Sequence, residues 1–298
     1  MSGQIATSSV TASRSRLADF YALTKPGITL TVTLTAAVGY WLGIADNNFA
    51  FWTFLHVLGG TALSSAGACA LNMAIEYRVD ARMGRTAKRP IPDGRIDVLE
   101  GTAFGFALAV GGVFWLGLGV GIMAGLIAAL ITVGYLFAYT PLKPMTSIST
   151  LVGALVGAAP PLIGWFAATG ALSLGGWILM AIVVFWQWPH ILSMAWMNRE
   201  DYQEVDYKLA PVADGTERSV AGQMLFSLVT LGVVSVLPFW QGMVGWIYLV
   251  PATAVGCWFA YLGVRFAMER SRARARATFF ASLVYLPVIL VALVFGKL

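Results

Sequence analysis

The chain has 298 residues, of which 58% are hydrophobic and only 11% are charged. An ordinary soluble domain carries about 25% charged residues. This composition therefore excludes a soluble globular protein and indicates an integral membrane protein.

Apolar segments long enough to cross a hydrocarbon core of about 30 Å recur along the whole chain. Strand-like alternation is absent, which favours an all-α helix bundle over a β-barrel. We predict nine transmembrane helices, at roughly 26–45, 51–75, 100–118, 121–140, 150–170, 173–196, 221–240, 244–264 and 278–296.

The distribution of cationic residues supports this number of spans independently of hydropathy. If every span crosses the lipid bilayer, 18 of the 19 Lys and Arg residues lie on one side and only Lys297 lies on the other. The positive-inside rule then predicts a cytoplasmic N-terminus and an outer C-terminus. We assign the net charge of +5 to this topology, so no nucleic-acid partner is expected. We divide the chain into a cytoplasmic tail, 1–24, and one transmembrane domain, 25–298.

A polar segment follows the second span, with the sequence NMAIEYRVDARMGRTAKRP at 72–90. Four residues of α-helix turn through about 400°, so Asn72, Glu76 and Asp80 share an arc of roughly 80°. An ordinary helix end with carboxylates paired to arginines is the alternative interpretation. Ionisable groups at a membrane boundary are, however, usually functional. Two carboxylates and an amide are oxygen ligands of the kind that Mg²⁺ shares with a phosphate.

Cationic side chains follow this acidic stripe directly. Topology alone would explain any one of Arg85, Lys88 and Arg89, but their clustering favours a diphosphate contact, because guanidinium groups bind phosphate through two hydrogen bonds. Lys143, in YTPLKP, is a further candidate for which spacing alone does not decide between topology and binding.

A second polar stripe follows the sixth predicted span. His190, Met194, Asn198 and Asp201 repeat the spacing of Asn72 to Met83, and Gln187 extends this stripe by one turn. Two related helical units that face each other would bring both stripes to a shared cavity. A hydrogen-bonded packing histidine is the alternative for His190, but the preceding proline is expected to open the helix locally, which favours a role facing a ligand.

Several separated blocks of the chain resemble the UbiA superfamily of intramembrane prenyltransferases, and more narrowly the branch that farnesylates protohaem IX, the haem O synthases. The blocks are LTKPGI at 23–28, NxxxExxxDxxMxRTxxRP at 72–90, YTPLK at 139–143, STLVGALVGAAPPLIGW at 149–165, WQWPH at 186–190 and EDY at 200–202. Apart from the resemblance, the double proline in the block at 149–165 predicts a kink in the fifth span.

The resemblance implies nine helices around a central cavity, Mg²⁺ as cofactor, farnesyl diphosphate as donor, haem b as acceptor, and water addition that gives haem O. It also implies a bacterial inner membrane more than a mitochondrial one, and makes a haem A synthase a candidate recipient of the product. The implied site residues are Asn72, Glu76, Asp80 and Asp201 for catalysis and metal binding, Arg85, Arg89 and Lys143 for the diphosphate, and Gln187 and His190 for haem.

Two departures from the family pattern and two alternative functions stay open. Glu76 stands where many members have the shorter Asp, and Asp206 is either an added ligand or a solvated acid. A prenyltransferase acting on an aromatic quinone precursor is one alternative, against which WQWPH argues. A transporter is the other, although its ionisable residues would be expected near the membrane midplane.

Overall fold

The computed structural model describes residues 15–45, 48–208 and 217–298, and within them the chain folds into helices. An isolated bridge between Val244 and Lys297 is the β-type pairing among these residues. The helices are α1 (Arg16–Leu23), α2 (Pro26–Gly43), α3 (Phe51–Ile75), α4 (Tyr77–Asp80), α5 (Val98–Gly119), α6 (Ile122–Val133), the π-helix η1 (Gly134–Tyr139), α7 (Thr140–Leu142), α8 (Ile148–Ala158), α9 (Pro160–Thr169), α10 (Leu174–Met197), α11 (Arg199–Glu204), α13 (Glu217–Trp240), α14 (Trp246–Glu269) and α15 (Arg272–Phe295).

The all-helical membrane architecture agrees with the sequence prediction. Within the described residues, eight segments are long and apolar enough to cross a membrane, and they correspond to the second to ninth predicted spans. The first predicted span is α2, whose 18 residues include four threonines and which is not among those eight. The total of nine crossings and the orientation of the termini therefore stay predictions.

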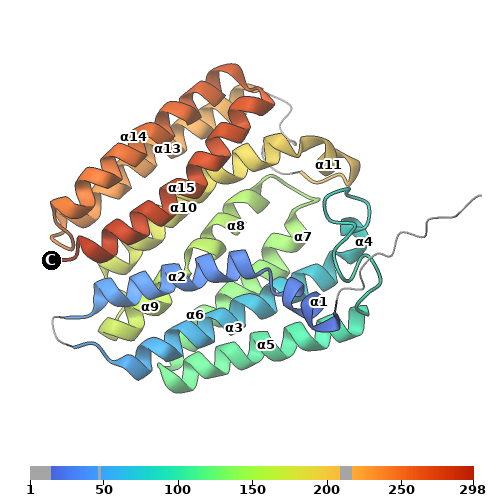
Figure 1. Ribbon diagram of the computed structural model, residues 1–298, viewed down its shortest axis with the longest axis horizontal. Coiled ribbons are helices and arrows are strands. Elements are labelled where there is room, and N and C mark those ends of the chain that lie inside the picture. The colour runs from blue at the N-terminus through green and yellow to red at the C-terminus, as the bar shows by residue number, and fades with distance from the viewer. Residues whose placement is uncertain (1–14, 46–47, 209–216) are drawn as a thin grey trace, which may run out of the picture.

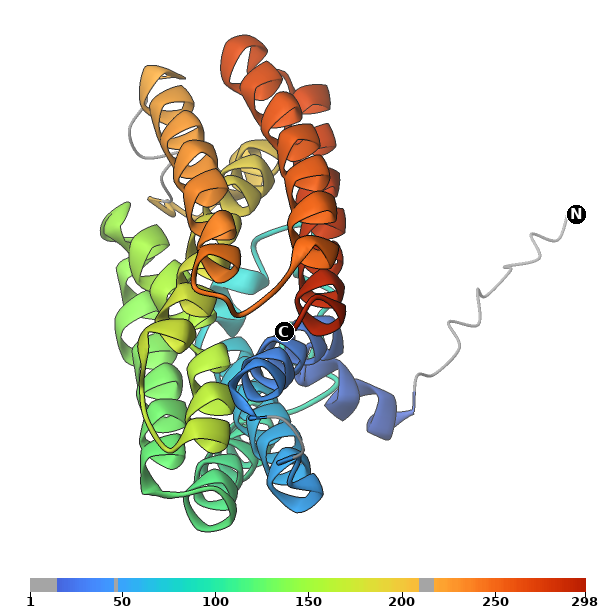
Figure 2. The same cartoon turned by 90° about the vertical axis from the view of Figure 1, so that its left-hand side faces the viewer.

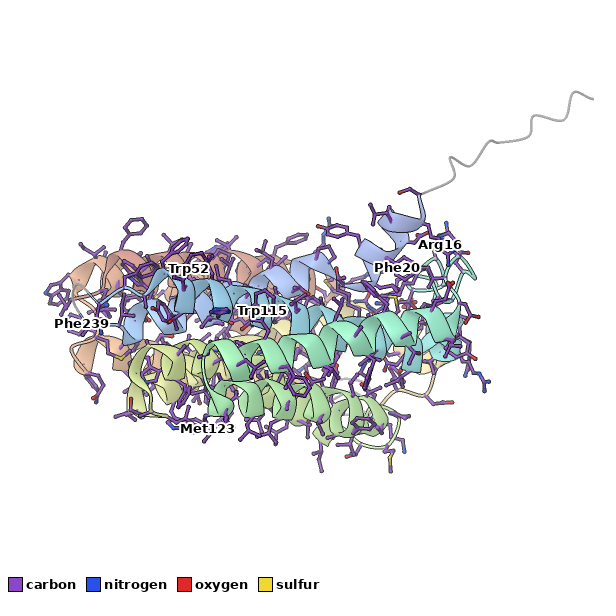
Figure 3. The ribbon with its side chains drawn as sticks, turned by 90° about the horizontal axis from the view of Figure 1, so that it is seen from below. Arg16, Phe20, Trp52, Trp115, Met123 and Phe239 are labelled. Carbon is purple, nitrogen blue, oxygen red and sulfur yellow. The ribbon has the colours of Figure 1, made fainter. Side chains whose placement is uncertain are left out.

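The short polar helices gather at one end of the bundle, which we call the polar end (Figure 1). Helices α1, α4 and α11 lie there, and the C-terminus lies at the opposite end. Seen along the bundle, α13 to α15 lie on one side and α3 and α5 on the other, with α2 between them (Figure 2). Arg16 and Phe20 mark the polar end in Figure 3, whereas Trp52 and Phe239 lie toward the far end.

Part of the predicted N-terminal tail is folded against the bundle. Residues 1–14 lie outside the described residues, but Ser15 caps α1 by accepting a hydrogen bond from the backbone N–H of Ala18. Asp19 on α1 is buried and binds Arg95 at 2.9 Å. This ion pair attaches α1 to the loop that carries the cationic residues after α4.

Glycines allow the closest contacts between helices. A Cβ atom at Gly164 of α9 would overlap the backbone of α2 at Ala36, and one at Gly67 of α3 would overlap the backbone of α5 at Ala109. The predicted kink of the fifth span is confirmed, because α8 ends at Ala158 and α9 begins at Pro160. The predicted opening before His190 is not observed, because α10 continues through its proline to Met197.

Candidate functional site

The first polar stripe is buried at the polar end. Helix α3 ends one residue before Glu76, but the backbone N–H of Glu76 donates to Asn72 at 2.9 Å and that of Asp80 donates to Glu76 at 2.8 Å. These two bonds keep the helical spacing across the junction with α4, so the three side chains share a face as predicted. Asn72, Glu76 and Asp80 are only 1%, 7% and 2% exposed.

Glu76 is the most densely bonded carboxylate of the stripe. Lys143 Nζ lies 2.8 and 2.9 Å from its two oxygens, the Tyr207 hydroxyl donates to Oε1 at 2.9 Å, and Asn72 Nδ2 donates to Oε2 at 2.9 Å. Burial by itself would raise the pKa of the Glu76 carboxyl, but Lys143 and Tyr207 stabilise its charged form and hold the pKa below its usual value of 4.5. Burial would likewise lower the pKa of Lys143, but Tyr139 and Glu76 raise it. The two side chains therefore form a buried ion pair.

The π-helix η1 and the first residue of α7 supply two of the groups that bind Asn72. The Tyr135 hydroxyl donates to Asn72 Oδ1 at 3.3 Å, and Asn72 Nδ2 donates to Thr140 Oγ1 at 3.1 Å. Lys25 Nζ completes the set by donating to Asn72 Oδ1 at 3.0 Å. Lys25 has a left-handed backbone, with φ of 45°, between α1 and α2. π-helices are rare and often occur at functional sites, which agrees with the position of η1 beside the stripe.

Asp80 is held by the loop that follows α4. Arg89 Nη1 lies 2.6 Å from Asp80 Oδ2, and the Thr86 hydroxyl donates to the Asp80 carbonyl at 2.7 Å. The carboxylate is thus buried beneath a guanidinium that is itself about one quarter exposed. Arg89 can therefore contact both the stripe and a ligand entering from the polar end.

The second polar stripe forms a separate wall. Asp201 on α11 lies 3.6 Å from Arg85 Nε, and Arg85 also donates to the Tyr202 hydroxyl at 2.9 Å. Asp206 is exposed and has a left-handed backbone, with φ of 55°, at the turn that buries Tyr207. The Arg85 and Asp201 pair therefore joins the loop that follows α4 to α11.

The charges of the first stripe favour an anion together with a metal ion. Lys25, Lys143 and Arg89 surround two carboxylates, which leaves an excess of positive charge. Burial lowers the pKa of Lys25, so a nearby anion would stabilise its charged form. No three His, Cys, Asp or Glu side chains among the described residues are close enough to hold a metal ion by themselves. The amide and carboxylate oxygens nevertheless fit Mg²⁺, which commonly takes one or two protein carboxylates and completes its shell with phosphate and water.

A narrow cavity extends from the stripe into the bundle between α2, α3, α6, η1, α8 and α9. It has a volume of about 100 Å³ and is lined mostly by apolar atoms. Tyr135 and Cys69 lie at its polar end and Thr61 lies at its far end. Eleven residues of α3 separate Thr61 from Asn72, or about 16 Å of helix. The Thr61 hydroxyl is buried and has no hydrogen-bond partner among the described residues.

The predicted acceptor residues lie deeper in the bundle. His190 is seven residues, or about 10 Å of helix, from the C-terminal end of α10 and stacks between Trp186 and Phe279. Gln187 packs against α8 at Gly157, where an added Cβ would lie 2.8 Å from the Gln187 amide oxygen. Gly157 also lines the cavity. The structure therefore places Gln187 beside the cavity wall and keeps His190 apart from the Asp201 wall.

The structure adds four residues to the predicted site: Lys25, Tyr135, Thr140 and Tyr207. Lys25 and Thr140 fall within the LTKPGI and YTPLK blocks, which could have identified them. Tyr135 precedes the second of these blocks, and no sequence signal singles out Tyr207.

Known proteins are similar to this chain in sequence and in fold. A model of the UbiA prenyltransferase family matches residues 32–284. A protein of Solibacter usitatus (strain Ellin6076) named protoheme IX farnesyltransferase is 43% identical over 279 residues, which cover 91% of this chain and 96% of that protein.

Solved structures support the same fold at lower sequence identity. A digeranylgeranylglyceryl phosphate synthase superposes with a TM-score of 0.78 at 18% identity, covering 94% of this chain and 98% of that one. A UbiA homologue from Archaeoglobus fulgidus bound to GPP and Mg²⁺ superposes with a TM-score of 0.59 at 14% identity, covering 93% of this chain and 99% of that one.

Proposed function

This chain belongs to the UbiA prenyltransferase family, and from that premise we propose that it transfers a farnesyl group from farnesyl diphosphate to a vinyl side chain of haem b, with addition of water. One observation carries the proposal: a buried carboxylate stripe lies inside a shell of cations at the mouth of an apolar cavity. The name of the Solibacter relative supports the choice of donor and acceptor. We place the reaction in a bacterial inner membrane, with a haem A synthase as the candidate recipient of the product.

The diphosphate would bind at the polar end. Mg²⁺ bound with it would neutralise charge that develops on the departing oxygens. Asn72, Glu76 and Asp80 would supply metal-binding oxygens from the first stripe and Asp201 from the second wall, with the diphosphate between them. The lysine and arginine side chains of the site would act on the diphosphate as fixed cations. The stripe already holds them at the polar end, so they would stabilise the leaving group with little reorganisation. These cations are Lys25, Arg85, Arg89 and Lys143.

The farnesyl chain would lie in the cavity that ends at Thr61. The distance from Asn72 to Thr61 along α3, about 16 Å, is close to the length of an extended farnesyl chain. The apolar lining would exclude water from the allylic cation that forms when the C–O bond breaks. A dry cavity of this depth favours transfer to the acceptor over hydrolysis.

The acceptor would approach from the side of α10. Gln187 and His190 lie on that helix, and Gln187 touches the cavity wall at Gly157. The electron pair of the C–O bond leaves with the diphosphate, and the vinyl π electrons form the new C–C bond. Water then supplies a hydroxyl group to the resulting cation and releases one proton. No side chain acts as a nucleophile in this sequence.

Product analysis tests the proposal. The purified full chain is incubated with haem b, farnesyl diphosphate and Mg²⁺, and the haem is analysed by mass spectrometry. We expect a mass increase equal to one farnesyl group plus a hydroxyl, and its loss in Asp80→Asn. Asp93→Asn, at an exposed acid of the loop that follows α4, should stay active. Unmodified haem with folded protein would refute the function, and full activity of Asp80→Asn would refute the site.

A further inference from the structure

His190 is held in one ring orientation by two aromatic neighbours. Trp186, one turn earlier on α10, stacks on it with ring centroids 5.2 Å apart, and Phe279 of α15 stacks on it at 4.9 Å. The interplanar angles are 26° and 29°. Both faces of the imidazole are therefore covered, so only the two nitrogens at its edge can bind a further group.

Ser282 of α15 determines which ring nitrogen carries the proton. Its Oγ lies 2.7 Å from His190 Nδ1 and 2.5 Å from the carbonyl oxygen of Phe279. A hydroxyl has one proton, and a carbonyl oxygen can only accept. At 2.5 Å the two oxygens would repel unless the serine proton lies between them, so the hydroxyl donates to Phe279 and accepts from His190. Nδ1 of His190 must then be protonated.

A second bond fixes Ser282 against α10. The indole N–H of Trp186 donates to the Ser282 carbonyl at 2.8 Å. Ser282 itself is fully buried, so water does not compete for its hydroxyl. Ser282 thus binds two ring side chains of α10: its carbonyl accepts from Trp186 and its hydroxyl contacts His190. These two hydrogen bonds connect α10 to α15.

The proton on Nδ1 leaves a lone pair on Nε2. No described residue forms a hydrogen bond with His190 Nε2, and the residue as a whole is half-buried. A packing histidine in a helix bundle normally has both nitrogens satisfied. An unprotonated imidazole nitrogen is a common ligand of iron, and a hydrogen bond at the other nitrogen fixes its tautomer.

We infer that Ser282 is a positioning residue that fixes His190 as the Nδ1–H tautomer, and that Nε2 binds the iron of the haem acceptor. The iron-binding part rests on the proposed function, whereas the tautomer is a property of the protein alone. Binding through the iron would hold the porphyrin on the α10 side of the cavity.

Nitrogen-15 NMR of the full-length protein labelled at histidine tests the tautomer without haem. The chain contains only two histidines, so His56→Gln identifies the signals of His190. We expect a protonated Nδ1 and an unprotonated Nε2 near neutral pH. Ser282→Ala should give a mixture of tautomers and Ser282→Thr should restore the single one. Ser227→Ala, which removes another buried serine hydroxyl that bonds within its own helix, should change nothing.

Titration with ferric haem b, followed by absorption and electron paramagnetic resonance spectra, tests the iron bond. We expect a histidine-ligated spectrum that is lost in His190→Gln, and an affinity for haem at least about tenfold weaker in Ser282→Ala. A protonated Nε2, or a tautomer unaffected by Ser282→Ala, would overturn the positioning role even if the enzyme farnesylates haem. The expected tautomer combined with a haem spectrum unchanged by His190→Gln would overturn the iron bond alone.

Discussion

Replacing Glu76 by glutamine tests the buried ion pair at the centre of the site. Three groups donate hydrogen bonds to this carboxylate: the Lys143 ammonium, the Tyr207 hydroxyl and the Asn72 amide. Glutamine keeps the size of the side chain but has one oxygen and an NH₂ group that must face a donor. The substitution therefore leaves Lys143 as a buried cation without its carboxylate.

The expected loss of stability follows from the burial of both partners. The side chains of Glu76 and Lys143 are only 8% and 11% exposed, so solvent screening is small. Removing one partner of a buried ion pair costs about 3–5 kcal/mol, whereas replacing both is often nearly neutral. We expect Glu76→Gln to lower the free energy of unfolding by about 3 kcal/mol, and Lys143→Met to restore most of that loss in the double variant. Both variants should be inactive, because both lack the Glu76 carboxylate and its ion pair with Lys143.

Denaturant unfolding in detergent measures these differences. Glu100→Gln is the control, because Glu100 and its partner Arg16 are largely exposed and such pairs contribute about 0–1 kcal/mol. The pKa of Glu76 is below 4.5 in the folded protein, so its contribution is complete above that pH and is lost as the pH falls through the folded value. The unfolding free energies of wild type and Glu76→Gln should therefore converge in acid. A Glu76→Gln protein as stable as wild type, or a double variant no more stable than the single one, would refute the ion pair.

Three further predictions concern the ligands. Arg89→Ala should raise KM for farnesyl diphosphate by about tenfold or more, because a hydrogen bond to a charged group contributes about 1.5–3 kcal/mol. The control, Arg78→Ala at an exposed arginine, should leave KM unchanged. Equal KM values for Arg89→Ala and wild type would exclude Arg89 from the diphosphate site. Thr61→Leu fills the far end of the cavity and should shift the ratio of kcat/KM from farnesyl toward geranyl diphosphate by about tenfold or more. Exposed Thr102→Leu is its control, and an unchanged ratio would place the chain elsewhere. Removal of Mg²⁺ by a chelator should abolish transfer while thermal unfolding stays unchanged, and activity that survives chelation would remove the metal from the account.

The parts of the site that could be predicted from the sequence depend on local geometry. The i, i+4 spacing of Asn72, Glu76 and Asp80 is a property of one helix, and it persists even though α3 ends before Glu76. The double proline likewise interrupts the helix after α8, since the effect of proline on its own backbone is local. The opening expected before His190 was wrong, because α10 continues as one helix through its proline to Met197.

The remaining contacts depend on distant parts of the chain. Tyr207 reaches Glu76 from a turn that the left-handed backbone of Asp206 creates. Lys25 reaches Asn72 from the junction of α1 and α2, where its own backbone is left-handed. Asp201 on α11 pairs with Arg85 in the loop after α4, and neither spacing nor hydropathy predicts such a pair. The π-helix η1 was likewise not predicted, since no hydropathy or spacing pattern singles out its six residues.

A structure of the full chain with Mg²⁺ and a non-ionisable thio analogue of farnesyl diphosphate tests the central claim most directly. We predict that the diphosphate contacts Lys143 and Arg89, that the metal ion lies beside Asp80, and that the farnesyl chain extends toward Thr61. A diphosphate bound away from the carboxylate stripe, or a chain lying outside the cavity, would contradict the proposed site.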